Sequence, residues 1–375
     1  MRILHTSDWH LGRSFHRESL LGAQAAFADH LVETVRAERV DVVAVSGDVY
    51  DRALPPVDAV ALLSDTLARL RAAGARVVLI SGNHDSALRL GFGSALIESS
   101  GVHVRTDPDQ AWEPVLIDGV AFYGIPYLEP ELVRTRWELP GRGHTAAISH
   151  AMGRIRSDAP RHQAAVVLAH CFVTGGEASD SERDISVGGV FHVPLPVFDG
   201  VDYVALGHLH GRQRMSETVR YSGSPLAYSF SETSHLKGSW LITLPTSAPG
   251  DPAAEFVPAP VPRPVGRLRG DLDDLLTLPR YSAYEDHWLQ ITLTDPVRPR
   301  SAMDRLRARF PHALALSFEP VGSLPAAQPV RTSGRPEAEV ALDFVREVRG
   351  EPAASEEEDL LRQAIEASRA KETMA

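Results

Sequence analysis

Val42-Val43-Ala44-Val45-Ser46-Gly47-Asp48-Val49-Tyr50-Asp51 and, 25 residues later, Val77-Val78-Leu79-Ile80-Ser81-Gly82-Asn83-His84-Asp85 are the two runs that decide the fold. Each run is a short β-branched segment that ends in a glycine and then in side chains that bind metals. Residues 58–74 lie between them with leucines at helical spacing, which predicts a β-α-β unit with parallel strands. Ligands gather at the carboxyl ends of such strands, and glycine permits the sharp turns that bring polar side chains together. This stretch therefore predicts a metal site.

Three other predicted strands end in the same kind of residue. Residues 2–6 lead into Asp8 and His10, residues 164–168 lead into His170, and residues 203–206 lead into a glycine followed by two histidines. A single histidine is more often a core or surface residue, and we interpret five others in this way: His5, His103, His144, His162 and His312. Eight candidates at successive strand ends instead predict one shared site. They are Asp8, His10, Asp48, Asn83, His84, His170, His208 and His210.

The ligand chemistry indicates the kind of metal. The single cysteine, Cys171, excludes an internal disulfide and a cysteine-rich zinc site, and a lone cysteine is usually a small buried apolar residue. Carboxylate, imidazole and amide ligands favour Mn²⁺, Fe²⁺ or Mg²⁺. Seven of these eight side chains, taken as ligands, are too many for one ion and suit two. Two ions can activate a bridging water and hold both the attacking and the leaving oxygen of a phosphate ester. Motifs for a protein nucleophile or a Walker A loop are absent from the sequence.

Charge and hydropathy limit the partners. The formal net charge is −11, from 38 basic and 49 acidic residues, so the chain as a whole is not attracted to nucleic acid. Local basic faces can still bind phosphates. One candidate face comprises Arg134, Arg136, Arg142, Arg154, Arg156 and Arg161, with a solvated arginine-rich surface as the alternative. No apolar signal segment or membrane-spanning run is present, so we expect a soluble, cytoplasmic protein.

The rest of the chain predicts at least two folded units. A polar, glycine-led loop spans residues 175–183, and residues 245–264 hold seven prolines and predict an extended connector. A small α+β unit follows, and residues 322–334 predict a second linker before two amphipathic helices. Other predicted helices cover residues 21–38, 86–100, 144–158, 301–310, 336–349 and 355–369. Other predicted strands cover residues 102–105, 115–117, 120–124, 287–293 and 313–318.

The order D-x-H, G-D-x-x-D, G-N-H-D, H and G-H-x-H resembles that of the calcineurin-like metallophosphoesterases. Four surrounding segments resemble the SbcD family, the nuclease subunits of bacterial SbcCD complexes: residues 6–12, 47–51, 175–183 and 221–225. The resemblance is dense to about residue 245 and architectural beyond it. It implies an α/β core of two mixed β-sheets flanked by helices, a small α+β capping domain and a C-terminal helical tail. The implied domains are 1–262 for the nuclease, 263–322 for DNA capping, and 323–375 for the linker and the partner-binding helices.

The resemblance also implies a role for each site residue. Asp8, His10 and His210 would bind the first metal, Asn83, His170 and His208 the second, and Asp48 would bridge the two. His84 would stay off the metals as a proton donor or charge stabiliser at the leaving oxygen. Asp51 stands where archaeal and eukaryotic relatives carry a second catalytic histidine. Asp51 and Asp85 are further candidate site residues outside the set of metal ligands.

The implied function is that of a Mn²⁺-dependent DNA nuclease, a double-strand exonuclease and hairpin or single-strand endonuclease in DNA end processing and repair. Two Mn²⁺ ions are expected, with Mg²⁺ or Fe²⁺ as alternatives, and ATP would act only through the partner, an SbcC-like coiled-coil ATPase. The tail helices would bind that coiled coil or else fold back on their own chain. Helices at 58–74 and 86–100 would form a homodimer within a heterotetramer, or else pack on the sheet core.

Two other functions fit the same residues. One is a stand-alone phosphodiesterase acting on a small cyclic nucleotide or a phosphoprotein, which would leave residues 280–375 without an evident use. The other is a catalytically silent module that binds DNA ends, against which the complete ligand set argues.

Overall fold

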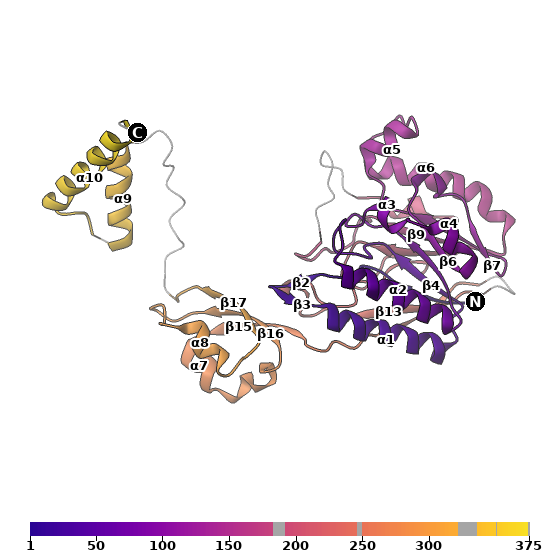
Figure 1. Ribbon diagram of the computed structural model, residues 1–375, viewed down its shortest axis with the longest axis horizontal. Coiled ribbons are helices and arrows are strands. Elements are labelled where there is room, and N and C mark those ends of the chain that lie inside the picture. The colour runs from indigo at the N-terminus through magenta and orange to yellow at the C-terminus, as the bar shows by residue number, and fades with distance from the viewer. Residues whose placement is uncertain (183–191, 246–249, 322–335, 350, 374–375) are drawn as a thin grey trace. The chain divides into compact units, whose positions relative to one another are not determined.

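The computed structural model describes residues 1–182, 192–245, 250–321, 336–349 and 351–373 (Figure 1). The chain divides into two compact units, Met1–Glu319 and Pro320–Ala375. The linker expected at 322–334 and the last residue of the loop expected at 175–183 lie outside the described residues. Within the described ranges, every helix is too short or too polar to cross a membrane.

Two six-stranded sheets form the centre of the first unit. The first sheet has the order β14 (Ala253–Pro258), β13 (Gly238–Thr243), β1 (Arg2–Thr6), β4 (Val42–Ser46), β5 (Arg76–Ile80), β6 (Val102–Arg105). The second has the order β11 (Gln213–Arg214), β12 (Val219–Tyr221), β10 (Tyr203–Gly207), β9 (Ala164–His170), β8 (Val120–Ile125), β7 (Val115–Ile117). Each sheet has four adjacent parallel strands with antiparallel strands at its margin. The expected fold class, two mixed sheets flanked by helices, is confirmed.

The alternation of side chains along each strand builds three apolar layers. Ile3, Val42 and Val166 belong to the layer between the two sheets. The neighbouring Leu4 and Val43 point the other way, into the layer beneath α1 (Leu21–Glu38) and α2 (Val57–Ala72). Helix α6 (Gly143–Asp158) covers the outer face of the second sheet. Because parallel strands buried on both faces must be apolar throughout, these strands appear in the sequence as unbroken apolar runs.

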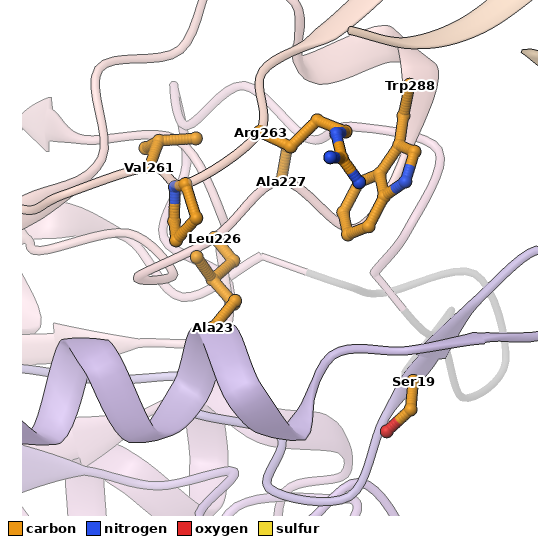
Figure 2. Close-up of a pocket in the computed structure, with 8 residues that line it drawn as sticks. Ser19, Ala23, Leu226, Ala227, Val261, Arg263 and Trp288 are labelled. Atoms are coloured by element: carbon orange, nitrogen blue, oxygen red, sulfur yellow. The ribbon is translucent and has the colours of Figure 1, made fainter. Parts of the chain in front are cut away.

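A third, three-stranded parallel sheet follows in the first unit, with the order β15 (Val265–Gly270), β16 (Trp288–Leu293), β17 (Ala313–Phe318). Helices α7 (Leu272–Thr277) and α8 (Ala302–Arg307) pack on it over a separate apolar core. A cavity of about 180 Å³ lies where α1, the segment at 226–227 and the connector at 261–263 meet Trp288. Figure 2 shows the residues that line it. The guanidinium of Arg263 lies 5.8 Å from the centre of the Trp288 ring.

The second unit contains two helices, α9 (Glu337–Arg349) and α10 (Ser355–Thr373), as the sequence predicts. The Arg349 guanidinium pairs with the Glu357 carboxylate at 2.8 Å. Phe344, Val348 and Leu360 keep most of their side-chain surface exposed.

Several segments differ from the sequence-based expectation. The single helix expected at 86–100 is broken into α3 (Ala87–Leu90), α4 (Ser94–Ile97) and a 3₁₀ turn, because Gly93 takes a left-handed φ of 73° that a continuous helix cannot hold. The connector expected at 245–264 supplies the edge strand β14, which pairs with β13. The hairpin of β2 (Ser14–Phe15) and β3 (Glu18–Ser19) and the helix α5 (Pro130–Arg136) are additions that the sequence pattern did not predict.

The two main sheets come into backbone contact at the end of β10. A Cβ atom added to Gly207 would lie 1.8 Å from the carbonyl oxygen of Ser46 in β4. The Ser46 hydroxyl also donates to the carbonyl of Ala205, 2.8 Å away. Only glycine permits this approach.

We predict that Gly207→Ala lowers the free energy of unfolding by about 3 kcal/mol or more, because the added methyl group forces the sheets apart. Urea denaturation followed by circular dichroism measures the change. Gly153→Ala in α6 is the matched control, since its new Cβ meets no atom within 4 Å and alanine favours helix. A Gly207→Ala variant as stable as wild type would contradict this account of the sheet contact.

Candidate metal centre

All eight candidate side chains lie at the carboxyl ends of five strands. Asp8 and His10 follow β1, Asp48 follows β4, and Asn83 and His84 follow β5. From the second sheet, His170 ends β9, and His208 and His210 follow β10. All eight residues except Asn83 are almost entirely buried. The structure therefore brings together residues that are up to 202 positions apart in the sequence.

One group of ligand atoms comes from the first strand and the last histidine. His10 Nε2 lies 3.1 Å from His210 Nε2 and 3.5 Å from Asp48 Oδ2. One ligand atom from each of Asp8, His10 and His210 lies within 4.8 Å of the other two. Two neutral ring nitrogens at 3.1 Å need either a shared proton or a cation between them.

A second group surrounds Asn83. His170 Nε2 lies 2.9 Å and His208 Nδ1 3.3 Å from Asn83 Oδ1, and His170 Nε2 is also 3.6 Å from Asp48 Oδ2. His170 Nδ1 lies 2.9 Å from the carbonyl of Ser46, which only accepts, so this ring nitrogen carries the proton. His170 Nε2 is then a lone-pair donor that faces an amide oxygen. Two facing lone pairs at this distance fit a cation, and the buried Asn83 Nδ2 has no hydrogen-bond partner among the described residues.

Burial and mutual charge shift the titration of these groups. Burial, and then the charge of Asp48, raises the pKa of Asp8 well above its usual value. Burial lowers the pKa values of His10 and His208 well below the usual value, and neighbouring imidazoles add to both effects. Neutral imidazoles are the form that binds metals, and a divalent cation would offset the repulsion between the two carboxylates.

The turns after the strands hold the backbone in a rare conformation. Asp8, His10, Asp48 and His208 all have positive φ, between 44° and 106°, which non-glycine residues seldom adopt. The turns after β1 and β4 also bond to each other, with His10 N–H donating to Asp48 O at 2.9 Å. Such strain persists where the surrounding structure enforces it, and it concentrates at functional sites.

His84 and Asp51 lie at the rim of this site. His84 Nδ1 is 2.8 Å from the carbonyl oxygen of Asp51, so Nδ1 carries a proton and Nε2 faces Asp48 Oδ2 at 4.0 Å. One ligand atom from each of His84, His10 and Asp48 also lies within 4.8 Å of the other two. The Asp51 carboxylate lies 3.2 Å from Arg13 and 3.6 Å from His10 Nδ1.

Asp85 supports the site without entering it. Its carboxylate accepts from the N–H groups of Val49, Tyr50 and Gly82 at 2.8 to 3.0 Å, which joins the turn after β4 to the turn after β5. Burial, and then the charge of Asp48, raises the pKa of Asp85 to about 7.

Sequence reasoning missed several residues that hold the site in place. The Gln24 side-chain amide donates to the carbonyl of His10 at 2.7 Å, and the Tyr228 hydroxyl donates to the carbonyl of Trp9 at 2.7 Å. Glu232 and Lys237 form a buried ion pair behind His210. Burial alone would raise the pKa of Glu232, but the Lys237 ammonium and His210 hold it well below its usual value. None of these residues follows a strand end in a motif, so only the pairing of distant segments reveals them.

Two other features of the sequence have structural explanations. In the candidate basic face, Arg134, Arg136 and Arg161 pair with nearby carboxylates, which favours the alternative of a solvated surface. Cys171 is fully buried, and burial raises the pKa of its thiol to about 12, so it is no nucleophile.

Two family models match this chain. Residues 1–212 match the family model described as calcineurin-like phosphoesterase. Residues 261–349 match the model SbcD_C, described as a type 5 capsule protein repressor C-terminal domain.

Similar solved structures include three that cover more than two thirds of the chain at low sequence identity. The protein TT1561 of Thermus thermophilus is 13% identical with a TM-score of 0.40, over 69% of this chain and 99% of its own. A dimetal phosphatase from Danio rerio is 16% identical with a TM-score of 0.41, over 70% and 97%. An archaeal phosphodiesterase is 12% identical with a TM-score of 0.33, over 68% and 100%.

Proposed function

Because the chain belongs to the calcineurin-like phosphoesterase family, we propose that it is a two-metal DNA nuclease of the SbcD type that works with an SbcC-like coiled-coil ATPase. The observation that carries the proposal is the presence in one chain of a phosphoesterase match over 1–212 and an SbcD_C match over 261–349. A phosphoesterase that acts alone on a small substrate would have no evident use for the second match.

In this proposal Asp8, His10 and His210 hold one ion, Asn83, His170 and His208 hold the other, and Asp48 bridges the two. The distances between their ligand atoms support the assignment. Mixed oxygen and nitrogen donors suit Mn²⁺, with Mg²⁺ or Fe²⁺ as alternatives. Two such ions supply an activated water and neutralise the charge of the phosphodiester.

The protein's own residues then position the substrate and manage protons. His84 donates Nδ1–H to the carbonyl of Asp51, which fixes its ring and directs Nε2 toward the centre. There an imidazolium can protonate or stabilise the leaving oxygen. Asp51 does not replace a histidine in this role, because its carboxylate is paired with Arg13.

Nuclease assays test the proposal. The purified chain, with and without an SbcC-type partner, is given blunt duplex DNA, hairpin DNA and bis-p-nitrophenyl phosphate, with Mn²⁺ and then with EDTA. The proposal expects Mn²⁺-dependent hydrolysis of all three and loss of every activity in Asp48→Asn. Hydrolysis of the small ester alone would indicate a stand-alone phosphodiesterase, and DNA binding without hydrolysis would indicate a silent end-binding module.

We predict that His84→Ala retains both metal ions and the fold but lowers turnover by roughly 10²- to 10⁴-fold, the usual cost of losing an acid–base group. Metal content measured by mass spectrometry is the control, and initial rates on duplex DNA are the readout. Cleavage at the wild-type rate would remove His84 from the mechanism, and loss of one ion would make it a ligand.

Exposed apolar side chains support a homodimer. Leu88, Phe92 and Leu96 are each more than 80% exposed on α3, α4 and the turn between them, and Val57 at the start of α2 is 83% exposed. The Arg89 guanidinium bonds to the carbonyl of Ala53 at 3.1 Å, which links the two segments. Exposed apolar patches on a protein surface often mark sites of protein–protein interaction.

We predict that Phe92→Glu converts a dimer of the 40.8 kDa chain into monomers, because the charge cannot be buried in an apolar interface. Sedimentation equilibrium gives the mass. Val297→Glu, at a side chain that is 80% exposed outside these segments, is the matched control and should leave the dimer intact. A wild-type monomer at micromolar concentration, or a dimeric Phe92→Glu, would refute the interface.

The tail is proposed to bind the coiled coil of the partner. Helices α9 and α10 expose Phe344, Val348 and Leu360. The apolar positions along the two helices suit a helix bound in a groove, and they are Val340, Phe344, Val348, Leu361 and Ile365. Short helices gain most of their stability from burying such a face.

We predict that deletion of residues 330–375 leaves the Mn²⁺-dependent hydrolysis of bis-p-nitrophenyl phosphate unchanged but abolishes co-purification with the partner and ATP-stimulated DNA cleavage. The compact unit Met1–Glu319 contains every proposed ligand, so the active site should persist. A truncated chain that unfolds, or that still binds the partner as tightly as wild type, would show that the tail serves its own chain or has another use.

A further inference from the structure

The glycine-led loop at residues 175–182 makes contact with a proposed metal ligand, His210. The His210 N–H donates to Glu182 Oε1 at 2.7 Å, and the His210 carbonyl accepts from Lys237 Nζ at 2.9 Å. Its ring nitrogen Nδ1 lies 2.6 Å from the hydroxyl oxygen of Ser181. The other ring nitrogen, Nε2, faces His10 in the candidate metal centre. The loop therefore holds one side of the ring, and the metal centre lies on the other.

Ser181 is in turn held by a buried ion pair. Its hydroxyl oxygen lies 2.5 Å from Glu232 Oε1, and Glu232 Oε2 accepts from Lys237 Nζ at 2.5 Å. Glu232 and Lys237 are 1% and 5% exposed. The three protons of the Lys237 ammonium are all used, on Glu232, on the His210 carbonyl and on the Ser224 hydroxyl. A carboxylate that is paired in this way can only accept hydrogen bonds.

The count of hydrogens fixes the direction of each bond. A serine hydroxyl has one hydrogen, and at 2.5 Å from the Glu232 carboxylate that hydrogen must lie between the two oxygens. The Ser181 oxygen can then only accept from His210, so His210 Nδ1 carries the ring proton. If the ring proton of His210 were on Nε2 instead, the Ser181 hydrogen would point at Nδ1. No hydrogen would then lie between the oxygens of Ser181 and Glu232, which are 2.5 Å apart. The Ser179 hydroxyl oxygen lies 2.9 Å from that of Ser181 but supplies no hydrogen to it, because the Ser179 hydroxyl donates to Glu182 at 2.6 Å.

We propose that Ser181, held by the Glu232–Lys237 ion pair, is a positioning residue that fixes the Nδ1–H tautomer of His210 and keeps Nε2 free to bind the first metal ion. The inference rests on the proposed two-metal function and gives the loop at 175–182 a role in it. Partners behind a ligand histidine set both its tautomer and its basicity, and losing them typically weakens metal binding by roughly 10- to 100-fold.

Calorimetry with Mn²⁺ on the full-length protein tests the metal-binding part. Wild type should show two binding events, and Ser181→Ala should weaken one of them by roughly 10- to 100-fold while the other stays unchanged. Ser181→Thr retains the hydroxyl and should restore the wild-type affinity. Ser229→Ala is the matched control, because Ser229 is also half-buried, its hydroxyl bonds to Ser231 and not to His210, and its main-chain carbonyl, which accepts from Glu232, is kept in the variant. Two unchanged events in Ser181→Ala would overturn the inference.

The tautomer itself is measured without metal by ¹⁵N nuclear magnetic resonance of labelled histidine, with His210→Gln to assign the signal. The inference expects a single Nδ1–H form of His210 in wild type and in Ser181→Thr, and a mixture of forms in Ser181→Ala. An Nε2–H form in wild type would overturn it. If wild type shows the Nδ1–H form but binds no Mn²⁺, the proposed function fails, and with it the claim on metal binding.

Discussion

The structure depends on keeping the carboxylate of Asp48 buried between two sets of imidazoles. Asp48 Oδ1 accepts the N–H of His84 at 2.8 Å, and Asp48 Oδ2 lies 3.5 and 3.6 Å from ring nitrogens of His10 and His170. A buried carboxylate without a compensating charge costs several kcal/mol, so the fold must bring donors or cations to it. The His84 N–H of the first sheet is one such donor. On the proposed assignment, metal ions held by imidazoles from both sheets would supply the compensating charge.

That convergence is achieved at the expense of local backbone stability. Asp48 has a φ of 47°, and a Cβ atom on Gly82 would lie 2.1 Å from its Oδ1. Each residue in a sparsely populated region of this kind costs on the order of 1–3 kcal/mol. The apolar layers on both faces of the first sheet offset these costs, since each buried aliphatic side chain contributes about 1.5–3 kcal/mol. The core thus stabilises turns that would not form alone.

The sequence could predict what local patterns encode. Apolar runs predicted the parallel strands, and the residues after them predicted the candidate site, because strand ends and ligands are neighbours in the chain. The break at Gly93 and the strand at 253–258 were missed, since a left-handed glycine and an edge strand in a proline-rich segment leave no periodic signal. Glu232 and Lys237 were missed for another reason. Their role is defined only by contact with His210, more than 20 positions away.

The two proposed metal positions differ in how their histidines are held. His170 donates to the main-chain carbonyl of Ser46, an acceptor that no substitution can remove. His210 instead relies on the side chain of Ser181, and His10 Nδ1 finds no hydrogen-bond partner among the described residues. On the proposed assignment, a main-chain acceptor therefore orients one ligand of the second ion, and a loop side chain orients one ligand of the first. Of these two ligands, His210 is the one whose orientation a substitution at its hydrogen-bond partner can change.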